Sequence, residues 1–460
     1  MKLSKKMRNN LIFAFVLFLF LVSRIYKITG IPVSVYWDEA SIGYNAYSIA
    51  TDLKDEWGDK LPLHFRAFGE FKLPVYIYSV AVFVKAIGLN EHAVRLPAVL
   101  YSLGTLIVVY LLVRKITKNE GIAILSGFIL SFSPWFFIFS RTGYEVTAGL
   151  FFFFLATYLF LLIDRSKYLL LVSMVGFVLS FYSYNSFRII IPIWLAILFV
   201  YRFHNLNALR KNWLPILISV LLFGLSLIPV YRLYKYDAGG ARFAQVEITS
   251  KTDFIKNYFS HFSSKFLFTT GDTNPRSQIP GHGQLYWFEL PLILVGVFAI
   301  LRSKRMLYLI PLVILLLAPI PAALTKESPH ALRALLAAPS FSIISAFGAF
   351  YLKDNFKKFG VIIFTTVVVA YYLSFELYIQ DFITKYPTQS AGAWQYEYKQ
   401  IFEKQRSGIV TDKYAQPYIF ALYYLKYPPE KFRGEVKLNP VSNWGFSKVV
   451  SFDGFQFTSK

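Results

Sequence analysis

The sequence predicts an all-α polytopic membrane protein with a small soluble α/β domain near its C-terminal end. Of its 460 residues, 56% are hydrophobic and 19% are aromatic, but only 16% are charged. A mean hydropathy of +0.47 is too apolar for an ordinary soluble protein. The composition becomes that of a soluble protein from about Gln380 onward. We therefore expect a multi-pass membrane domain at residues 1–379 and a separate outer domain at residues 380–460.

The charge of the chain fits a membrane protein better than a nucleic-acid-binding protein. Its net charge of +22 arises from 48 Lys and Arg against 26 Asp and Glu. The basic residues lie in short clusters between apolar runs, as is typical of loops that flank membrane spans. No nucleic-acid partner is therefore expected. The chain has no cysteine, which excludes disulfides, thiolate metal ligands and cysteine nucleophiles.

The N-terminus is predicted to be an uncleaved membrane anchor. Residues 11–22 contain no charge, and residues 1–10 include the basic side chains Lys2, Lys5, Lys6 and Arg8. Residues 23–27 offer no small-residue cleavage site, which favours an anchor over a secretory signal. The basic flank places the N-terminus in the cytoplasm, and the protein in the cell (plasma or inner) membrane.

Residues 29–73 are polar and rich in turns, and they are predicted to form the first outer loop. Within this loop, apolar residues recur at helical spacing at Ile42, Ala46, Ile49 and Leu53. This spacing predicts a short amphipathic helix on the membrane surface, beginning at Asp38.

The orientation of all later segments depends on the apolar run at residues 74–88. Its length of about 15 residues is shorter than the roughly 20 that a spanning helix needs. If the run does not span, the basic loops all face the cytoplasm, and if it spans they all face outward; these loops are residues 114–118, 165–167, 202–211, 302–305 and 353–358. The sequence therefore favours an interfacial or re-entrant helix, with a spanning helix as the alternative.

Further spans bring the predicted total, with the anchor, to about eleven transmembrane helices. They cover residues 96–113, 121–139, 146–163, 168–184, 188–201, 213–231, 286–301, 306–324, 331–352 and 359–377. The long outer loop at residues 232–285 is glycine-rich and aromatic, so it is either a lid over a substrate or a plain connection. In the outer domain the pattern predicts helices at residues 393–405 and 417–427 and a strand at residues 408–411.

Two adjacent carboxylates, Asp38 and Glu39, are the candidate catalytic residues. A carboxylate at the membrane surface can take a proton from an acceptor hydroxyl and so act as a general base. The same pair also suits a helix start, with Asp38 as the cap and Glu39 in the first turn, and the two roles are compatible. Tyr44, in the same stretch, is a candidate substrate contact. Two carboxylates are too few ligands to assign a metal, and the use of a divalent metal stays open.

Cationic side chains are the candidates for binding a lipid-linked phosphate. Lys72 and Arg95 lie at the starts of apolar helices, where a cation and free backbone N–H groups together favour an anion. The alternative, of equal weight, is that both side chains extend toward lipid headgroups. His330 and Arg333 share one helical face at i, i+3 spacing. Arg188 is another arginine at the start of a span.

Arg141 and Glu145 are spaced i, i+4 at the outer end of a hairpin between spans. They are interpreted either as a helix-end ion pair or as substrate contacts.

No glycine motif that cradles a nucleotide follows a strand, so a nucleotide-sugar or ATP site is not expected.

In order and spacing, these motifs resemble the glycosyltransferase C (GT-C) superfamily, in particular family 39, which includes protein O-mannosyltransferases and the aminoarabinose transferases of lipid A. The resemblance covers residues 1–200 and rests on the anchor followed by Trp37-Asp38-Glu39, then Lys72-Leu73-Pro74, Arg95-Leu96-Pro97 and Ser140-Arg141. It implies a GT-C type fold and an enzyme that takes a sugar from a polyprenyl-phosphate carrier. By carry-over, Asp38 matches the catalytic acidic residue and Lys72 a cation near the carrier phosphate.

The sequence also departs from known subgroups of that superfamily. Ser41 stands where the aminoarabinose transferases carry an arginine, and the large luminal repeat domain of the eukaryotic protein mannosyltransferases is missing. The predicted function is therefore general. It is inverting transfer of a hexosyl or pentosyl unit, with Asp38 as base, to a hydroxyl of a protein, lipid or polysaccharide on the outer face. The alternative is a flippase, transporter or polysaccharide-handling protein of the cell envelope, although the internal repeats typical of transporters are not found.

Overall fold

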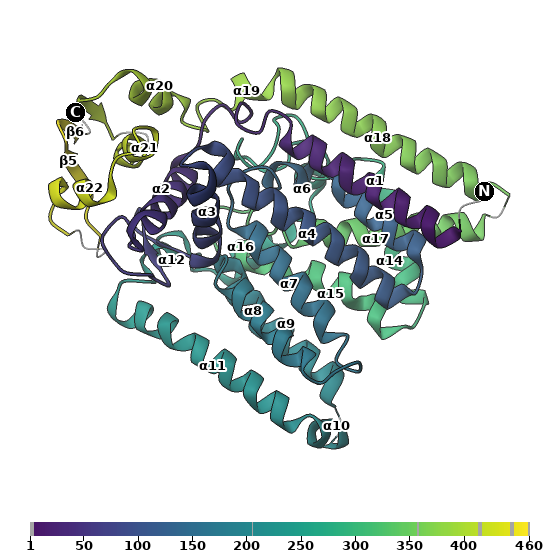
Figure 1. Ribbon diagram of the computed structural model, residues 1–460. Coiled ribbons are helices and arrows are strands. Elements are labelled where there is room, and N and C mark those ends of the chain that lie inside the picture. The colour runs from purple at the N-terminus through teal and green to yellow at the C-terminus, as the bar shows by residue number, and fades with distance from the viewer. Residues whose placement is uncertain (1–3, 205, 357, 413–415, 442–445, 459–460) are drawn as a thin grey trace.

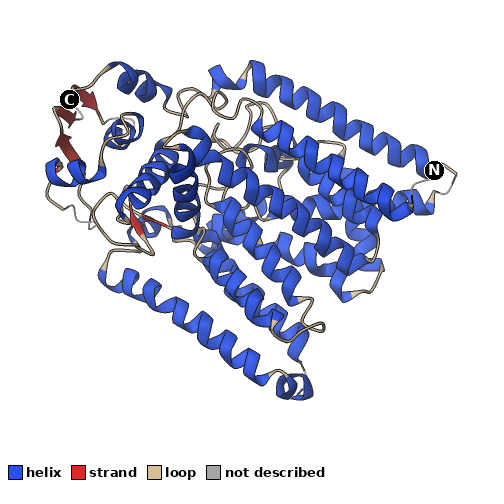
Figure 2. Cartoon of the chain, in the orientation of Figure 1, coloured by secondary structure: helices blue, strands red, loops and turns tan. Residues whose placement is uncertain are grey.

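The computed structural model describes residues 4–204, 206–356, 358–412, 416–441 and 446–458. Long helices make up most of the molecule, and a small sheet lies beside the C-terminus, at the opposite side of the picture from the N-terminus (Figures 1 and 2). The predicted combination of a mostly helical chain and a small sheet near the C-terminus is therefore present, and the division into two domains stays a prediction. The expected boundary at residue 380 falls inside a helix, α18 (Gly360–Thr384).

The helical part begins with α1 (Lys5–Ile25) and continues from α4 to α19. These elements are α4 (Glu91–Thr117), α5 (Glu120–Phe132), α6 (Pro134–Phe139), α7 (Val146–Phe160), α8 (Leu169–Phe181), α9 (Asn185–Phe203), α10 (Leu206–Lys211), α11 (Trp213–Tyr236), α14 (Glu289–Arg302), the 3₁₀ helix η2 (Met306–Leu309), α15 (Ile310–Leu317), α16 (Ile320–Ala323), α17 (Ala337–Asn355), α18 and α19 (Tyr386–Gln389). Each segment predicted to span contains helix, although residues 331–336 form turns before α17.

Within the described residues, six helical stretches are long and apolar enough to cross a membrane. They are Lys5–Ile25, Glu91–Thr117, Asn185–Phe203, Trp213–Tyr236, Met306–Ala323 and Gly360–Thr384. Four apolar helices are shorter, including α3 (Pro74–Ile87), whose 14 residues extend only about 21 Å. That length is below the roughly 30 Å of a hydrocarbon core, as the sequence indicated. The total of about eleven spans stays a prediction.

Close helix packing in the bundle depends on small residues. At the contact between α14 and α17, a Cβ on Gly296 would lie 2.0 Å from the Ile344 carbonyl oxygen, and one on Gly348 would lie 2.0 Å from that of Leu292. Only glycine lets the two backbones approach this closely, a device common between helices in lipid.

The short helix predicted in the first outer loop is present, and most of its residues are buried. It is α2 (Trp37–Asp52), which follows the cap residue Tyr36, so Asp38 lies in the first turn rather than at the cap. It packs against α3 and against α21 (Pro417–Tyr424) of the outer domain. A Cβ on Gly43 would lie 2.6 Å from the Tyr423 ring. Its position at the membrane surface stays a prediction, and its burial was not predicted because α21, which packs against it, is far away in the sequence.

The outer domain contains α20 (Tyr396–Lys404), α21, α22 (Pro429–Glu435) and the strands β3 (Gly408–Thr411), β4 (Lys437–Leu438), β5 (Val449–Phe452) and β6 (Phe455–Thr458). The sheet order is β3-β6-β5-β4, with β3 parallel to β6 and the other pairs antiparallel. The two predicted helices and the predicted strand are all present, although both helices are shorter than predicted. Aromatic side chains of this sheet share one hydrophobic core with α2 and α3.

Polar contacts also join the outer domain to the first outer loop. Arg433 of α22 donates to Ser48 Oγ at 3.1 Å and to the Asp55 carbonyl at 3.0 Å, and it pairs with Asp52. Glu56 is fully buried beside this junction. Burial, followed by repulsion from Asp55, raises the pKa of Glu56 to about 8.

The Glu56 proton makes stability depend on pH. Because its pKa in the folded protein lies above the usual 4.5, the folded state binds the proton more tightly than the unfolded state. The free energy of unfolding therefore falls as the pH rises from about 4.5 to 8, by at most about 1.4 kcal/mol per pH unit. We expect Glu56→Gln to melt near the wild type at pH 5 and above it at pH 8.5, measured by thermal unfolding in detergent. The exposed control Glu403→Gln should follow the wild type, and an E56Q variant that also does so would refute the assignment.

Candidate active site

An ion pair between Asp38 and Lys72 lies at the centre of the candidate site. Asp38 is held by the first turn of α2, and Lys72 ends β2 (Phe71–Lys72), which pairs antiparallel with β1 (Phe65–Arg66). The Lys72 side chain is 4% exposed, whereas that of Asp38 is 24% exposed. The carboxylate is therefore the partner that a substrate can reach. A second carboxylate, Glu70, lies 3.4 Å from Lys72 Nζ.

Lys72 stays charged because of the carboxylates around it. Burial alone would lower its pKa, but Asp38, Glu145 and Glu70 raise it above its ordinary value. Glu145 lies just before α7, and its Oε1 is buried without a hydrogen-bond partner. Burial raises the pKa of Glu145 to about 8, although Lys72 acts in the opposite direction. At neutral pH the site thus combines a lysine-paired carboxylate with a neighbouring carboxyl group that mostly keeps its proton.

Glu39 is turned away from Asp38 and pairs with Arg95, and both side chains are completely buried. The carboxylate accepts from Arg95 Nε and Nη2 at 3.0 Å each, and from the Gly143 amide at 2.6 Å. The same guanidinium donates to the carbonyl oxygens of Ile28, Pro32 and Ser34. These contacts use all five N–H donors of Arg95. The structure therefore places Arg95 as an internal clamp and leaves it no donor for a phosphate.

Arg141 and Tyr44 are likewise bonded inside the protein. Arg141 donates to the carbonyl oxygens of Ser23, Tyr26 and Ile31. Its guanidinium lies 4.4 Å from the centre of the Phe382 ring. The helix-end ion pair with Glu145 does not form, because α6 ends at Phe139 and the intervening residues form a turn. The Tyr44 hydroxyl donates to the Tyr427 carbonyl at 3.1 Å.

His330 and Arg333 belong to a neighbouring cluster rather than to the Asp38 pair. They lie in turns before α17, so the helical face that the sequence predicted is not formed. His330 Nδ1 is 3.8 Å from Asp272 Oδ2, and burial, followed by repulsion from Arg333, holds its pKa well below the usual range. Arg333 donates to Thr325 Oγ1 at 2.6 Å and to an oxygen of Glu327.

The Tyr184 hydroxyl is subject to the charges of both this cluster and the carboxylates. Burial raises the pKa of this hydroxyl, the charge of Arg333 lowers it, and the charges of Glu145, Glu70 and Asp38 raise it. The Tyr184 hydroxyl therefore lies within electrostatic reach of both groups.

Sequence reasoning assigned no role to Glu70, Tyr184 or Arg276. Arg276 comes from the long outer loop, which also forms α12 (Ala241–Val246), α13 (Lys251–Ser260) and a π-helical turn, η1 (Lys265–Thr269). Its guanidinium lies 4.9 Å from the centre of the Tyr36 ring and donates to the Ala393 carbonyl at 3.0 Å. The only signal in the sequence was its place as the one cation in the turn-rich stretch 271–276.

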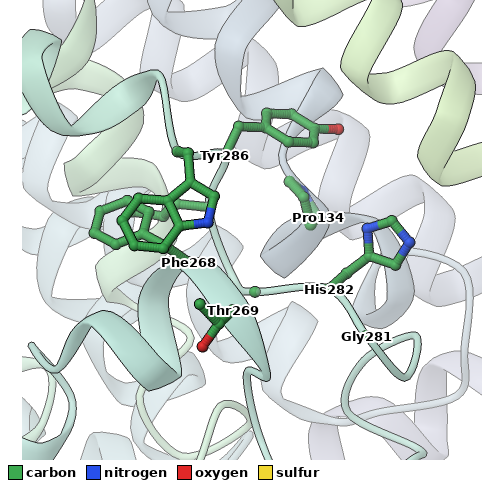
Figure 3. A pocket seen from close by; sticks show the side chains of 9 residues that line it. Pro134, Phe268, Thr269, Gly281, His282 and Tyr286 are labelled. Atoms are coloured by element: carbon green, nitrogen blue, oxygen red, sulfur yellow. The ribbon is translucent and has the colours of Figure 1, made fainter.

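Two hollows open near these residues. One, of about 360 Å³, is lined by Pro134, Phe268, His282 and Tyr286 among others (Figure 3), but by neither Asp38 nor Lys72. The other is an apolar groove of about 690 Å³ between α3, α8 and α11. Pro74 and Val75, two and three residues after Lys72, line this groove. The groove therefore reaches the part of the chain that carries the ion pair.

No three His, Asp or Glu side chains in the described part of the chain are grouped as ligands for a metal ion. The carboxylates of Asp38 and Glu70 share Lys72 between them.

Comparison with known proteins gives a match of sequence and several of fold. Residues 72–230, about a third of the chain, match the family model for Dolichyl-phosphate-mannose-protein mannosyltransferase. No curated protein sequence matches significantly. The structure of ArnT from Cupriavidus metallidurans in the apo state aligns with a TM-score of 0.53 at 12% identity, covering 91% of this chain and 84% of that one. In fold, the chain is therefore similar to these GT-C structures, and part of its sequence is similar to a mannosyltransferase family. This confirms the predicted resemblance.

Two further structures of similar fold are complexes with a lipid phosphate. ArnT from the same organism bound to undecaprenyl phosphate aligns with a TM-score of 0.51 at 11% identity, covering 92% of this chain and 86% of that one. AglB, the oligosaccharyltransferase of Archaeoglobus fulgidus, in complex with an inhibitory peptide and a dolichol-phosphate, aligns at 0.53 with 13% identity. This chain spans 60% of the length of AglB, less than two thirds. The GT-C fold and the apolar helices together indicate a multi-pass membrane protein.

The two adjacent carboxylates should differ sharply in their effect on stability. Glu39→Ala leaves the Arg95 charge buried and unpaired, which should destabilise the protein by about 3–5 kcal/mol. Asp38→Asn should cost far less, because Lys72 keeps Glu70 as a partner. Thermal unfolding in detergent should show a large drop in Tm for the first variant alone, and equal Tm values would contradict the assignment. The double variant Glu39→Ala with Arg95→Met should recover part of the loss.

Proposed function

We propose that this protein is a membrane glycosyltransferase that moves a sugar from a polyprenyl-phosphate donor to an acceptor hydroxyl on the outer face of the cell membrane. The observation that carries the proposal is an accessible carboxylate, Asp38, held against a buried Lys72 beside an apolar groove. The structures of ArnT with undecaprenyl phosphate and of AglB with a dolichol-phosphate support it, because proteins of this fold bind such carriers. The proposal covers hexosyl and pentosyl donors and a protein, lipid or polysaccharide acceptor.

In the proposed reaction, Asp38 is the general base. The acceptor oxygen attacks the anomeric carbon while its proton passes to Asp38, and the bond from that carbon to the phosphate oxygen breaks. The bonding electrons leave on the phosphate, and a single displacement inverts the anomeric centre. Lys72 orients Asp38 and supplies positive charge beside the departing phosphate. Glu145, when protonated, is a hydrogen-bond donor toward a sugar hydroxyl or phosphate oxygen.

The remaining predicted residues take supporting roles in this proposal. Glu39 and Arg95 fix the first turn of α2, and with it the direction of Asp38, so we assign them a positioning role. The charges of Arg333 and Asp38 both act on Tyr184, and Arg276 lies over the ring of Tyr36, directly before α2. His330, Arg333, Tyr184 and Arg276 are therefore our candidates for contacts with the bound substrate. With the N-terminus in the cytoplasm, Asp38 and the domain at residues 380–460 lie on the outer side.

Loss of the Asp38 base should abolish most transfer. We expect Asp38→Asn to lower the rate by a factor of about 10²–10⁴, the usual contribution of general base catalysis. Purified protein in lipid is given radiolabelled polyprenyl-phosphate sugars and a membrane extract as acceptor, and movement of label to the acceptor is measured. Asp59→Asn, an exposed acid in the same loop, should retain full activity. A well-folded Asp38→Asn protein with wild-type transfer would refute the assigned base.

The Glu145 proton should appear in the pH dependence of transfer. As the pH rises through about 8, Glu145 loses its proton, a donor disappears, and a second negative charge arises beside Asp38 and Lys72. Wild-type transfer should therefore fall above pH 8. Glu145→Gln keeps a neutral donor at every pH, so its rate should stay level between pH 7 and 9. A variant that loses activity over the same range as the wild type would assign the fall to another group.

A further inference from the structure

Arg188 is a partly buried cation without a counter-charge. It lies in the first turn of α9, and its Nη2 is 2.9 Å from His64 Nε2. The guanidinium lies 5.6 Å and 5.9 Å from the ring centres of Phe181 and Tyr182, and its Nε is buried with no hydrogen-bond partner. No ion pair in the described part of the chain includes it.

The His64 partner supplies no charge of either sign. Burial, followed by repulsion from Arg188, lowers the pKa of His64 to about 4. The imidazole is therefore neutral at physiological pH, and its Nε2 accepts from the guanidinium while the proton stays on Nδ1. Arg188 also has a hydrogen bond with the Tyr234 side chain, but no carboxylate. A buried guanidinium without a counter-charge is costly, so an anion from outside the chain would be bound there favourably.

This cation lies at the edge of the apolar groove. Leu63, directly before His64, lines the groove, and so does Tyr182, beside whose ring the guanidinium lies. Tyr182 also connects the groove to the segment that follows Lys72, because the Tyr182 carbonyl accepts from the Val75 amide at 3.4 Å. Val75 is three residues from Lys72. The groove thus brings together an apolar wall, an unpaired guanidinium and the segment that holds the Asp38 partner.

The other candidate cations have acceptors or counter-charges of their own. The charge of Lys72 is matched by Asp38 and Glu70, and all donors of Arg95 are used within the fold. Arg333 pairs with Glu327. Arg276 lies over Tyr36 and donates to a carbonyl, away from the lining of the groove.

We infer that Arg188, supported by the neutral His64, is the binding site for the phosphate of a polyprenyl-phosphate donor whose chain lies in the groove. This inference rests on the proposed function, since it names the residue that holds the leaving group. Transfer converts a singly charged phosphodiester into a phosphomonoester that carries up to two charges. The guanidinium fork, with its free Nε–H, stabilises the additional charge on the phosphate oxygens as the sugar departs.

The test measures binding separately from transfer. Full-length protein in phosphatidylcholine nanodiscs is titrated with undecaprenyl phosphate, with undecaprenol as the uncharged arm and phosphatidylglycerol as the phospholipid arm. Binding is followed by native mass spectrometry and by the shift in Tm. Undecaprenyl phosphate should bind and stabilise the wild type more strongly than either of the other two lipids.

The variants then identify the cation. Arg188→Met should weaken binding of undecaprenyl phosphate roughly tenfold to hundredfold, the loss expected for charged hydrogen bonds. Arg188→Lys keeps the charge but not the forked guanidinium, so its affinity for undecaprenyl phosphate should lie between those of the wild type and Arg188→Met. If Arg188→Met does not fold, the comparison of Arg188→Lys with the wild type tests the inference. The exposed control Arg165→Met should bind like the wild type. Wild-type affinity in both Arg188 variants would overturn the inference, and so would equal stabilisation by phosphatidylglycerol.

The outcome is distinguishable from failure of the transferase proposal. If the wild type transfers sugar, Asp38→Asn does not, and the Arg188 variants still bind the carrier normally, only the phosphate site is wrong. If undecaprenyl phosphate binding depends on Arg188 but no donor sugar is ever transferred, the phosphate site stands and the transferase proposal fails.

Discussion

The buried pair between Glu39 and Arg95 is the contact on which the geometry of the candidate site depends. Its hydrogen bonds join the end of α1, the first outer loop, the start of α4 and the turn at Gly143. With Glu39 fixed inward at the third position of α2, the preceding residue must project from a different side of the helix, because successive residues are rotated by about 100°. An internal ion pair therefore determines that Asp38 faces outward, where Lys72 can meet it.

The cations around the site differ in function because they differ in counter-charge. Arg95 is neutralised by a carboxylate that water cannot reach, and Lys72 by one that a substrate can reach. Arg188 has a neutral imidazole, the Tyr234 hydroxyl and aromatic rings beside it, but no carboxylate. In a medium of low dielectric constant, such differences in pairing outweigh the similarity of the side chains. In the roles proposed above, residues of equal formal charge thus serve as clamp, catalytic partner and anion receptor within one small region.

Much of the fold could be predicted from the sequence, because membrane helices are recorded locally as long apolar runs. The short length of α3, the first outer loop and the small outer α/β part were visible in the same way. The direction of a side chain was not, because it depends on partners that are distant in sequence. Arg95 looked like a phosphate ligand until Glu39, 56 residues earlier, accounted for its donors. Arg188 and His64 are 124 residues apart, and no local sequence pattern predicts their contact.

The attachment of the outer domain has a consequence for how the protein matures during its synthesis. Tyr44 and Tyr427 are 383 residues apart, and Arg433 reaches Ser48 across 385 residues. The helix that carries Asp38 therefore leaves the ribosome early, whereas the surface that buries it is translated near the end. Until then, the side of α2 that packs against α21 has no protein partner. A nascent chain already inserted in the bilayer therefore carries α2 without the C-terminal part that packs against it, so an incomplete translation product would lack part of the burial around the candidate site.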